Sequence, residues 1–135
     1  MTVRLTIELP HPPERVRAYL RDPATRTQWQ SSLRRVDDVA GRGEVGSTWT
    51  DVTWPGLRPA MRVTEDSPDR WAEAGEWRGA TAGLALDFAA APAGTRLGVE
   101  ADVVPPPGLG WLRRPLEAAA ARAIAADLRR AGRRM

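Results

Sequence analysis

The 135-residue sequence contains no cysteine and a single histidine, His11. Without cysteine, the chain cannot form disulfides, thiolate metal sites, iron–sulfur clusters or a cysteine nucleophile. With one histidine it cannot build a histidine metal site or a pair of catalytic histidines, and it has no Asp/Asn-rich loop of the calcium-binding type. These absences leave carboxylate-bound Mg²⁺ or Ca²⁺ as the remaining type of metal site. We expect no metal and no cofactor. We expect His11, which lies in the turn after the first strand-like segment, to face solvent.

Lysine is also missing, so all 20 basic residues are arginine, against 17 acidic residues and a formal net charge of +3. Because arginine keeps its charge at high pH, a high isoelectric point exaggerates how basic this chain is. A lysine-free composition is typical of high-GC bacterial genomes. The acidic residues are spread along the chain, and the arginines near the C-terminus suit the negative end of a helix dipole. We therefore do not expect nucleic-acid binding.

The sequence also lacks long hydrophobic runs. The first ten residues contain no apolar stretch of signal-peptide length, and no run approaches the roughly 20 apolar residues of a membrane span. We expect a cytoplasmic protein without membrane insertion. The length of the chain suits one domain with one core, so residues 1–135 are expected to form a single domain.

The N-terminal segment predicts a strand followed by two short helices. Apolar and polar residues alternate over residues 3–9, which is typical of a strand with one buried face. Pro10 ends that strand, and Pro12 and Pro13 suit the first turn of a helix. Asp22 precedes a proline and can cap a second turn, which ends at Trp29.

The rest of the chain predicts an antiparallel meander and a C-terminal helix. Strand-like segments separated by Gly, Pro and Asp turns are expected at 36–39, 47–54, 60–65, 71–77, 84–88 and 97–103, with a loop over AAAPAGT. The spacing then changes to a helical period, which predicts a helix over residues 115–131. Its apolar stripe is Leu116, Ala120, Ile124 (or Ala123) and Leu128.

In this order, the segments PPERVRAYLRDPATRTQW, VGSTW, VTEDSPDRW, GTRLGVEADV and GLGWLRRPLE resemble the START-like, helix-grip superfamily called SRPBCC. The resemblance covers nearly the whole chain, and it is strongest to polyketide cyclase/dehydrase-like members. It implies an α+β fold in which a curved antiparallel sheet of about six to seven strands wraps a long C-terminal helix. It also implies that the two short helices plug one end, and that the space between sheet and helix often holds an apolar small molecule.

The candidate ligand contacts follow from the strand pattern and from this resemblance. Trp71, Glu73, Gly75 and Trp77 share one strand face, and the resemblance implies that Trp71 points inward. Glu73 would then point inward as well, where a carboxylate needs a partner or a proton. Alternatively, a bulge near Gly75 turns Glu73 toward solvent or toward Arg62.

Other candidates also have two interpretations. Trp29 either lines the cavity or packs the short helices against the long one. Trp49 and Trp54 are an odd number of residues apart in one expected strand, so their side chains lie on opposite faces. The resemblance implies that Trp49 is the one that points inward. The alanine run 118–121 either reflects helix propensity or leaves space for a ligand. The proposed ligand contacts are Trp29, Trp49, Met61, Trp71, Glu73, Leu86, Ala120 and Ile124.

No nucleophile–base pair is visible in the sequence, so Glu73, Arg62 and Tyr19 are the only catalytic candidates, as groups that act on protons. The leading interpretation is a binding protein for an apolar or aromatic, polyketide- or lipid-like molecule, with a polyketide aromatase/cyclase as its catalytic form. The alternative is a protein-interaction module of the same fold, similar to toxins or co-chaperones, without catalysis. The sequence leaves open whether the chain is an enzyme, and whether it is a monomer or a homodimer.

Overall fold

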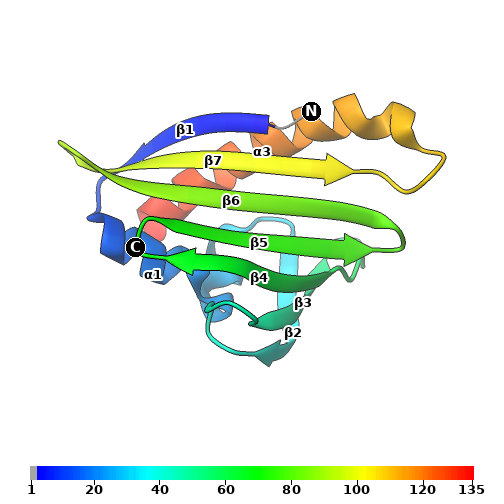
Figure 1. Cartoon of the computed structure of the whole chain (residues 1–135), viewed down its shortest axis with the longest axis horizontal. Helices are drawn as coiled ribbons and strands as arrows, with labels where there is room; N and C mark the ends of the chain where they lie inside the picture. Colours follow the sequence, from blue (N-terminus) through cyan, green and yellow to red (C-terminus); the bar gives the residue numbers. More distant parts are fainter. Residues whose placement is uncertain (1–2) are drawn as a thin grey trace.

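The computed structural model describes residues 3–135 and has the α+β helix-grip arrangement that the sequence predicts (Figure 1). Seven strands form one antiparallel sheet in the order β1-β7-β6-β5-β4-β3-β2. The strands are β1 (Val3–Leu9), β2 (Leu33–Ala40), β3 (Thr48–Thr53), β4 (Ala60–Ser67), β5 (Arg70–Trp77), β6 (Ala80–Ala91) and β7 (Gly94–Val104). The helices are α1 (Pro13–Arg21), η1 (Pro23–Thr25), α2 (Arg26–Trp29), η2 (Gly110–Leu112) and α3 (Arg113–Arg134).

The two short helices lie between β1 and β2, as expected from their prolines. Helix α1 begins at Pro13 and buries Val16 and Leu20 against the core. Asp22 ends it, and the Asp22 carboxylate accepts a hydrogen bond from the backbone N–H of Ala24 at 2.9 Å. This cap starts η1, which leads into the four-residue helix α2. The break at Asp22 therefore sets the direction in which α2 presents its side chains.

The sheet is longer at its centre than the sequence predicts. Strands β6 and β7 pair from Thr81 and Val104 to a tight turn at Pro92, so most of the expected AAAPAGT loop is strand. Alanine is apolar and small, and here its low strand propensity is outweighed by pairing with the neighbouring strand. The β5–β6 turn is formed by Arg78 and Gly79, whose positive φ angles suit a two-residue hairpin.

Helix α3 crosses one face of the sheet diagonally and contacts β1, β7 and α2 (Figure 1). It extends beyond the expected 115–131 at both ends. Leu128 and Ala131 are fully buried, but Leu116 is 40% exposed, so its assignment to the buried stripe was wrong. At that turn of the helix, Glu117 takes the buried position. Among residues 3–135, no helix has the length and apolar character needed to cross a bilayer.

The C-terminal end of α3 is fastened to the segment after β1. His11 is half-buried, and its Nε2 lies 2.9 Å from the carbonyl oxygen of Gly132, so the expectation that it faces solvent was wrong. Arg15 donates to the carbonyl oxygen of Met135. A side chain at Gly132 would meet Leu9 at 2.8 Å, which shows how closely the helix approaches β1 here. The sequence could not reveal this contact because the partners are 121 residues apart.

The packed core lies between this end of α3, helix α1 and the middle of the sheet. Trp71 and Leu86 face each other across β5 and β6, and both are fully buried. The indole N–H of Trp71 donates to the carbonyl oxygen of Gly43 at 2.8 Å. Gly43 has a φ of 105°, and a Cβ there would lie 2.2 Å from the carbonyl oxygen of Arg21. The loop before β3 therefore needs glycine to close over Trp71.

Candidate functional site

A buried group of charged side chains lies where α2 meets the sheet. The Arg26 guanidinium donates two hydrogen bonds to the Glu73 carboxylate, from Nη1 to Oε2 at 2.8 Å and from Nη2 to Oε1 at 3.1 Å. The same Nη2 donates to Gln30 Oε1 at 2.9 Å and lies 3.6 Å from Asp51 Oδ2. All three charged side chains are at least nine-tenths buried. Two carboxylates therefore share one guanidinium away from water.

Tryptophan rings enclose this group. The guanidinium carbon of Arg26 lies 4.9 Å from the ring centre of Trp49 and 5.6 Å from that of Trp29, distances at which a cation is attracted to an aromatic face. The Trp49 indole N–H donates to Asp51 Oδ1 at 2.8 Å. The Trp29 indole N–H is buried and has no hydrogen-bond partner among residues 3–135. The rings thus hold both Arg26 and Asp51 in place.

Strand parity explains why the two acids face inward. Trp49 and Asp51 are two residues apart in β3, and Trp71 and Glu73 are two apart in β5, so each acid follows a buried tryptophan on the same face. The sequence left open a bulge near Gly75 that would expose Glu73. Instead, β5 pairs regularly through Gly75 with both neighbours, and the irregularity lies in β4 after Val63. Glu73 is buried, and its partner is Arg26 rather than Arg62.

Within this group, the neutral form of Glu73 is favoured more strongly than it is in water. Burial raises the pKa of Glu73, the Arg26 guanidinium offsets part of that rise, and the charge of Asp51 adds to it. For Arg26, burial acts to lower the pKa, but Glu73 and Asp51 outweigh it, and the net direction is upward. The guanidinium therefore stays charged. A carboxyl group with a raised pKa can exchange a proton with a bound molecule, which is what general acid–base chemistry requires.

A cavity of about 390 Å³ lies next to this charged group, between the sheet and α3. Its volume falls within the range of roughly 300–1,000 Å³ that is usual for small-molecule pockets. Its apolar lining residues include Trp29, Leu57, Pro59, Met61, Trp77, Ala82, Leu84, Ala101, Val103, Ala120, Ala123, Ile124 and Leu128. Arg26, Asp51, Glu73 and Asp127 add charged groups to the lining.

The structure brings five of the eight expected ligand contacts to this cavity. Trp29, Met61, Glu73, Ala120 and Ile124 all belong to its lining. For Trp29, both interpretations hold, since it is 4% exposed in the core and also borders the cavity.

The other three expected contacts lie in the packed core and not in the lining. Trp49, Trp71 and Leu86 are each at most 2% exposed. The expected inward orientation of Trp49 is correct, and Trp54 on the same strand is 62% exposed. A strand pattern gives the face on which a side chain lies, but it does not tell whether the space there is filled.

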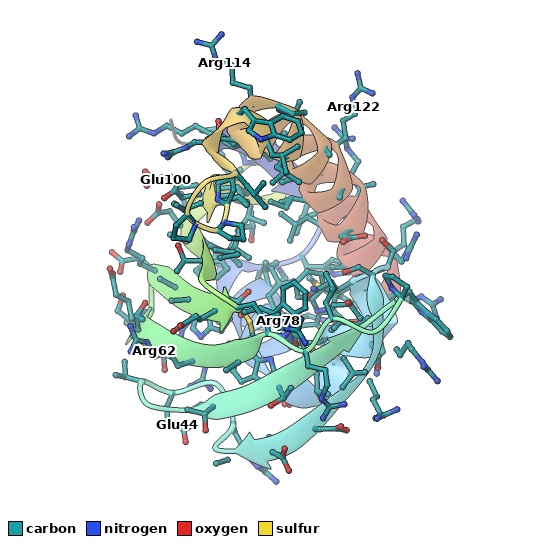
Figure 2. All side chains as sticks on the ribbon, turned by 90° about the vertical axis from the view of Figure 1, so that its right-hand side faces the viewer. Glu44, Arg62, Arg78, Glu100, Arg114 and Arg122 are labelled. Atoms are coloured by element: carbon teal, nitrogen blue, oxygen red, sulfur yellow. The ribbon has the colours of Figure 1, made fainter. Side chains whose placement is uncertain are left out.

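Two of the three catalytic candidates lie away from the cavity. Arg62 projects from the outer side of the sheet and is exposed (Figure 2). Tyr19 is half-buried on α1, where its hydroxyl donates to Gln28 Oε1 at 2.9 Å. Burial raises the pKa of Tyr19, and Arg134 partly opposes that effect. Of these candidates, only Glu73 lines the cavity.

The sequence interpretation missed Arg26, Asp51 and Asp127. Asp51 could have been found, because it shares strand parity with Trp49. Asp127 is 6% exposed and lies three residues after Ile124, on the inward side of the helical stripe. Arg26 gave only a weak signal, because its helix has four residues and its partner Glu73 lies 47 residues away. In the part of the chain that the structure describes, no group of three or more acidic or histidine side chains is placed to hold a metal ion.

A family model supports the resemblance seen in the sequence. The model described as "Polyketide cyclase / dehydrase and lipid transport" matches residues 1–135. None of the curated protein sequences matches the chain significantly.

Solved structures match the fold over nearly the whole chain. Protein MLL2253 from Mesorhizobium loti is 17% identical, with a TM-score of 0.79, and the match covers 98% of this chain and 95% of that one. TTHA0849 from Thermus thermophilus is 21% identical, with a TM-score of 0.78 and coverage of 99% and 96%. DynU16, from the dynemicin biosynthetic locus, is 19% identical with a TM-score of 0.66, and the match covers 95% of this chain and 46% of DynU16. At these identities the matches establish the fold alone.

Proposed function

We propose a small-molecule binding function for this chain, which belongs to the polyketide cyclase/dehydrase and lipid transport family. The ligand is an apolar or aromatic molecule of polyketide- or lipid-like type, held between the sheet and α3. The observation that carries this proposal is the cavity of about 390 Å³, in which apolar walls surround one buried charged group. That DynU16 belongs to a biosynthetic locus is consistent with such a ligand.

The residues of the site have different roles in binding. Trp29, Met61 and Ile124 offer apolar surface to the body of the ligand. Glu73 is the group that would exchange a proton with a ligand that reacts, because it lines the cavity and its pKa is raised. Arg26 fixes the position of Glu73 through the two hydrogen bonds described above. In a catalytic form of this function, holding the ligand in shape would be the main contribution of the fold.

The test is a thermal-shift and tryptophan-fluorescence screen with flat polycyclic compounds and long-chain fatty acids. A compound present at about 100 times its Kd raises the free energy of unfolding by about 2.7 kcal/mol. Because Trp29 borders the cavity, its emission should change when the cavity fills. If no apolar compound shifts the melting temperature or the emission, the binding proposal is wrong.

A second candidate function, that of a protein-interaction module, is favoured by a different observation. Trp111 and Trp54 are 74% and 62% exposed, and Leu57, Leu109 and Leu116 are each about 40% exposed. Large apolar side chains at the surface are a common feature of protein contacts. Sedimentation velocity would test self-association of the wild type against Trp111→Ser. A concentration-dependent dimer that the substitution abolishes supports this candidate, and a monomer at all concentrations argues against self-association.

A further inference from the structure

The charges that line the cavity are strongly unbalanced. Within residues 3–135, the inward acidic residues of the lining are Asp51, Glu73 and Asp127, and Arg26 is the only basic residue of the lining. Glu76 and Asp102 also border the cavity, but they alternate with the inward residues Gly75 and Ala101 on their strands. Asp102 is balanced by Arg113, which donates to it at 3.0 Å. Arginines elsewhere give the chain its positive net charge, and Arg114 and Arg122 project from α3 away from the sheet (Figure 2). A chain that is basic overall therefore has an acidic cavity.

The positive charge of Arg26 is already offset within the buried group. Its two terminal nitrogens donate to Glu73 and Gln30, its Nη2 lies 3.6 Å from Asp51 Oδ2, and its Nε is buried without a partner among residues 3–135. A ligand carboxylate in the cavity would therefore meet the carboxylates of Asp51 and Asp127 without a free cation to offset them. Like charges in a poorly solvated space repel each other strongly, which disfavours fatty acids and other anionic ligands.

One carboxylate oxygen of the lining accepts no hydrogen bond from residues 3–135, and a second is held only by a long ion pair. Asp127 is 6% exposed, and it uses Oδ1 to accept from the backbone N–H of Ser31 at 3.2 Å. Its Oδ2 receives no hydrogen bond from any residue between 3 and 135. Asp51 uses Oδ1 for the indole of Trp49, and its Oδ2 lies 3.6 Å from the nearest Arg26 nitrogen, too far for a good hydrogen bond. Carboxylate oxygens at a cavity wall that lack a close donor favour donors in the ligand, and a positive charge satisfies them best.

We infer that the ligand carries a protonated amine on its apolar or aromatic body, and that Asp51 and Asp127 hold that amine. This inference rests on the proposed function, because it concerns the ligand of the same cavity. An ammonium group has three donors and no acceptor, so it can donate to Asp127 Oδ2 and also to Asp51 Oδ2, which Arg26 reaches only at 3.6 Å. It also offsets the excess negative charge next to Glu73, which a neutral or anionic group does not.

The experiment compares three probes with the same ring and different charge: naphthylmethylamine, naphthalenemethanol and naphthoic acid. Calorimetry and tryptophan fluorescence at neutral pH give a Kd for each. The amine should bind about tenfold more tightly than the alcohol, as expected for one charge-assisted hydrogen bond in place of a neutral one, and the acid should bind most weakly.

Isosteric variants assign the preference to the aspartates. Asp127→Asn keeps an oxygen for the Ser31 N–H, and Asp51→Asn keeps one for the Trp49 indole, so both should fold. In each variant the advantage of the amine over the alcohol should fall by several-fold, while the Kd of the alcohol changes little. Glu8→Gln, an exposed charge change outside the cavity lining, is the matched control and should keep the full advantage.

The outcomes separate this inference from the proposed function. If the amine and the alcohol bind equally, or the acid binds best, the inference is wrong and the binding function stands. The inference is also wrong if both aspartate variants retain the full preference for the amine. If none of the three probes nor any compound of the wider screen binds, the binding function itself is wrong. If Asp51→Asn does not fold, Asp127→Asn and the wild-type probe series still decide the question.

Discussion

The two ends of the space between the sheet and α3 are built from the same elements but differ in side-chain size. At the end near α1, Trp71 and Leu86 pair across β5 and β6, and both are fully buried. At the other end, the corresponding inward pair is Gly75 and Ala82, and both residues line the cavity. Glu73 lies between them on β5. The same strand therefore passes from a filled core, through the charged group, to an open cavity.

The neighbouring elements follow the same gradient. Along the inward face of β7, Leu97 and Val99 are buried at the filled end, whereas Ala101 borders the cavity. Along α3, Ala120 and Leu128 both border the cavity, but the larger Leu128, two turns later, is fully buried. Small residues on facing elements leave a volume that the backbone cannot close. The difference shows that the cavity is set by side-chain size at matched positions, since the sheet pairing continues unchanged through it.

The largest expected effect is at the filled end. Trp71→Ala should lower the free energy of unfolding by about 3–5 kcal/mol, because it leaves a large hole in a packed core. It also removes the donor to the Gly43 carbonyl. Trp77→Ala at the open end is the matched control, because Trp77 is only half-buried and borders the cavity. Urea denaturation measures both changes, and similar midpoints for the two variants would contradict the contrast between the ends.

Much of this fold could be predicted from the sequence. The alternation of residues 3–9 gave β1, the prolines and Asp22 gave the short helices, and the helical stripe with Ala120 and Leu128 gave α3. These signals are local, because they depend on neighbours within a turn or a strand. Leu116 and His11 were placed wrongly because the final packing of α3 depends on contacts with segments far away in sequence.

The site could be predicted less well, for a physical reason. Parity placed Glu73 inward, but its partner Arg26 comes from a short helix whose orientation depends on the whole fold. The boundary between filled core and cavity depends on how side chains from α2, α3 and strands β3 to β7 combine in space. For that reason Trp71 was grouped with Ala120 as a ligand contact, although only Ala120 lines the cavity.

The charged group between the two ends should give the second largest effect on stability. Arg26→Met should destabilise the fold by about 3–4 kcal/mol, because it leaves Glu73 and Asp51 buried without their cation. Adding Glu73→Leu to Arg26→Met should recover part of that loss, since one of the two uncompensated acids is then removed. Denaturation of both variants and of Glu73→Leu completes the double-mutant cycle. Additive effects would mean that Arg26 and Glu73 do not interact.

The pH dependence of stability tests the protonation of Glu73 in the same charged group, and its expected effect is smaller. Burial raises the pKa of Glu73, so the folded state holds this proton more firmly than the unfolded chain does. The stability contributed by neutral Glu73 is complete below the ordinary glutamate pKa, and it falls as the pH rises through the folded pKa. The fall amounts to about 1.4 kcal/mol for each unit by which the pKa is raised.

The measurement is the difference in unfolding free energy between the wild type and Glu73→Gln, from mildly acidic to neutral pH. The other titrating groups are common to both proteins, so their contributions largely cancel in this difference. As the pH rises, the unfolding free energy of the wild type should fall relative to that of Glu73→Gln. Movement in the opposite direction would show that Arg26 lowers the pKa of Glu73 below its ordinary value, and that the pair is a simple ion pair.

The smallest effect on stability, and the sharpest test of the open end, is expected from Ala120→Leu. Leucine is nearly as good a helix former as alanine, and its extra atoms would extend into the cavity instead of into packed neighbours. The free energy of unfolding should therefore change by less than about 1 kcal/mol. The affinity for a naphthyl probe should nevertheless fall by about tenfold or more, because the leucine occupies space that the ligand needs.

Ala119→Leu adds the same side chain at an exposed position of α3 and should leave binding unchanged. If Ala120→Leu binds the probe as tightly as the wild type while Trp71→Ala unfolds the protein as expected, the contrast between the ends is real but the ligand does not occupy the open one.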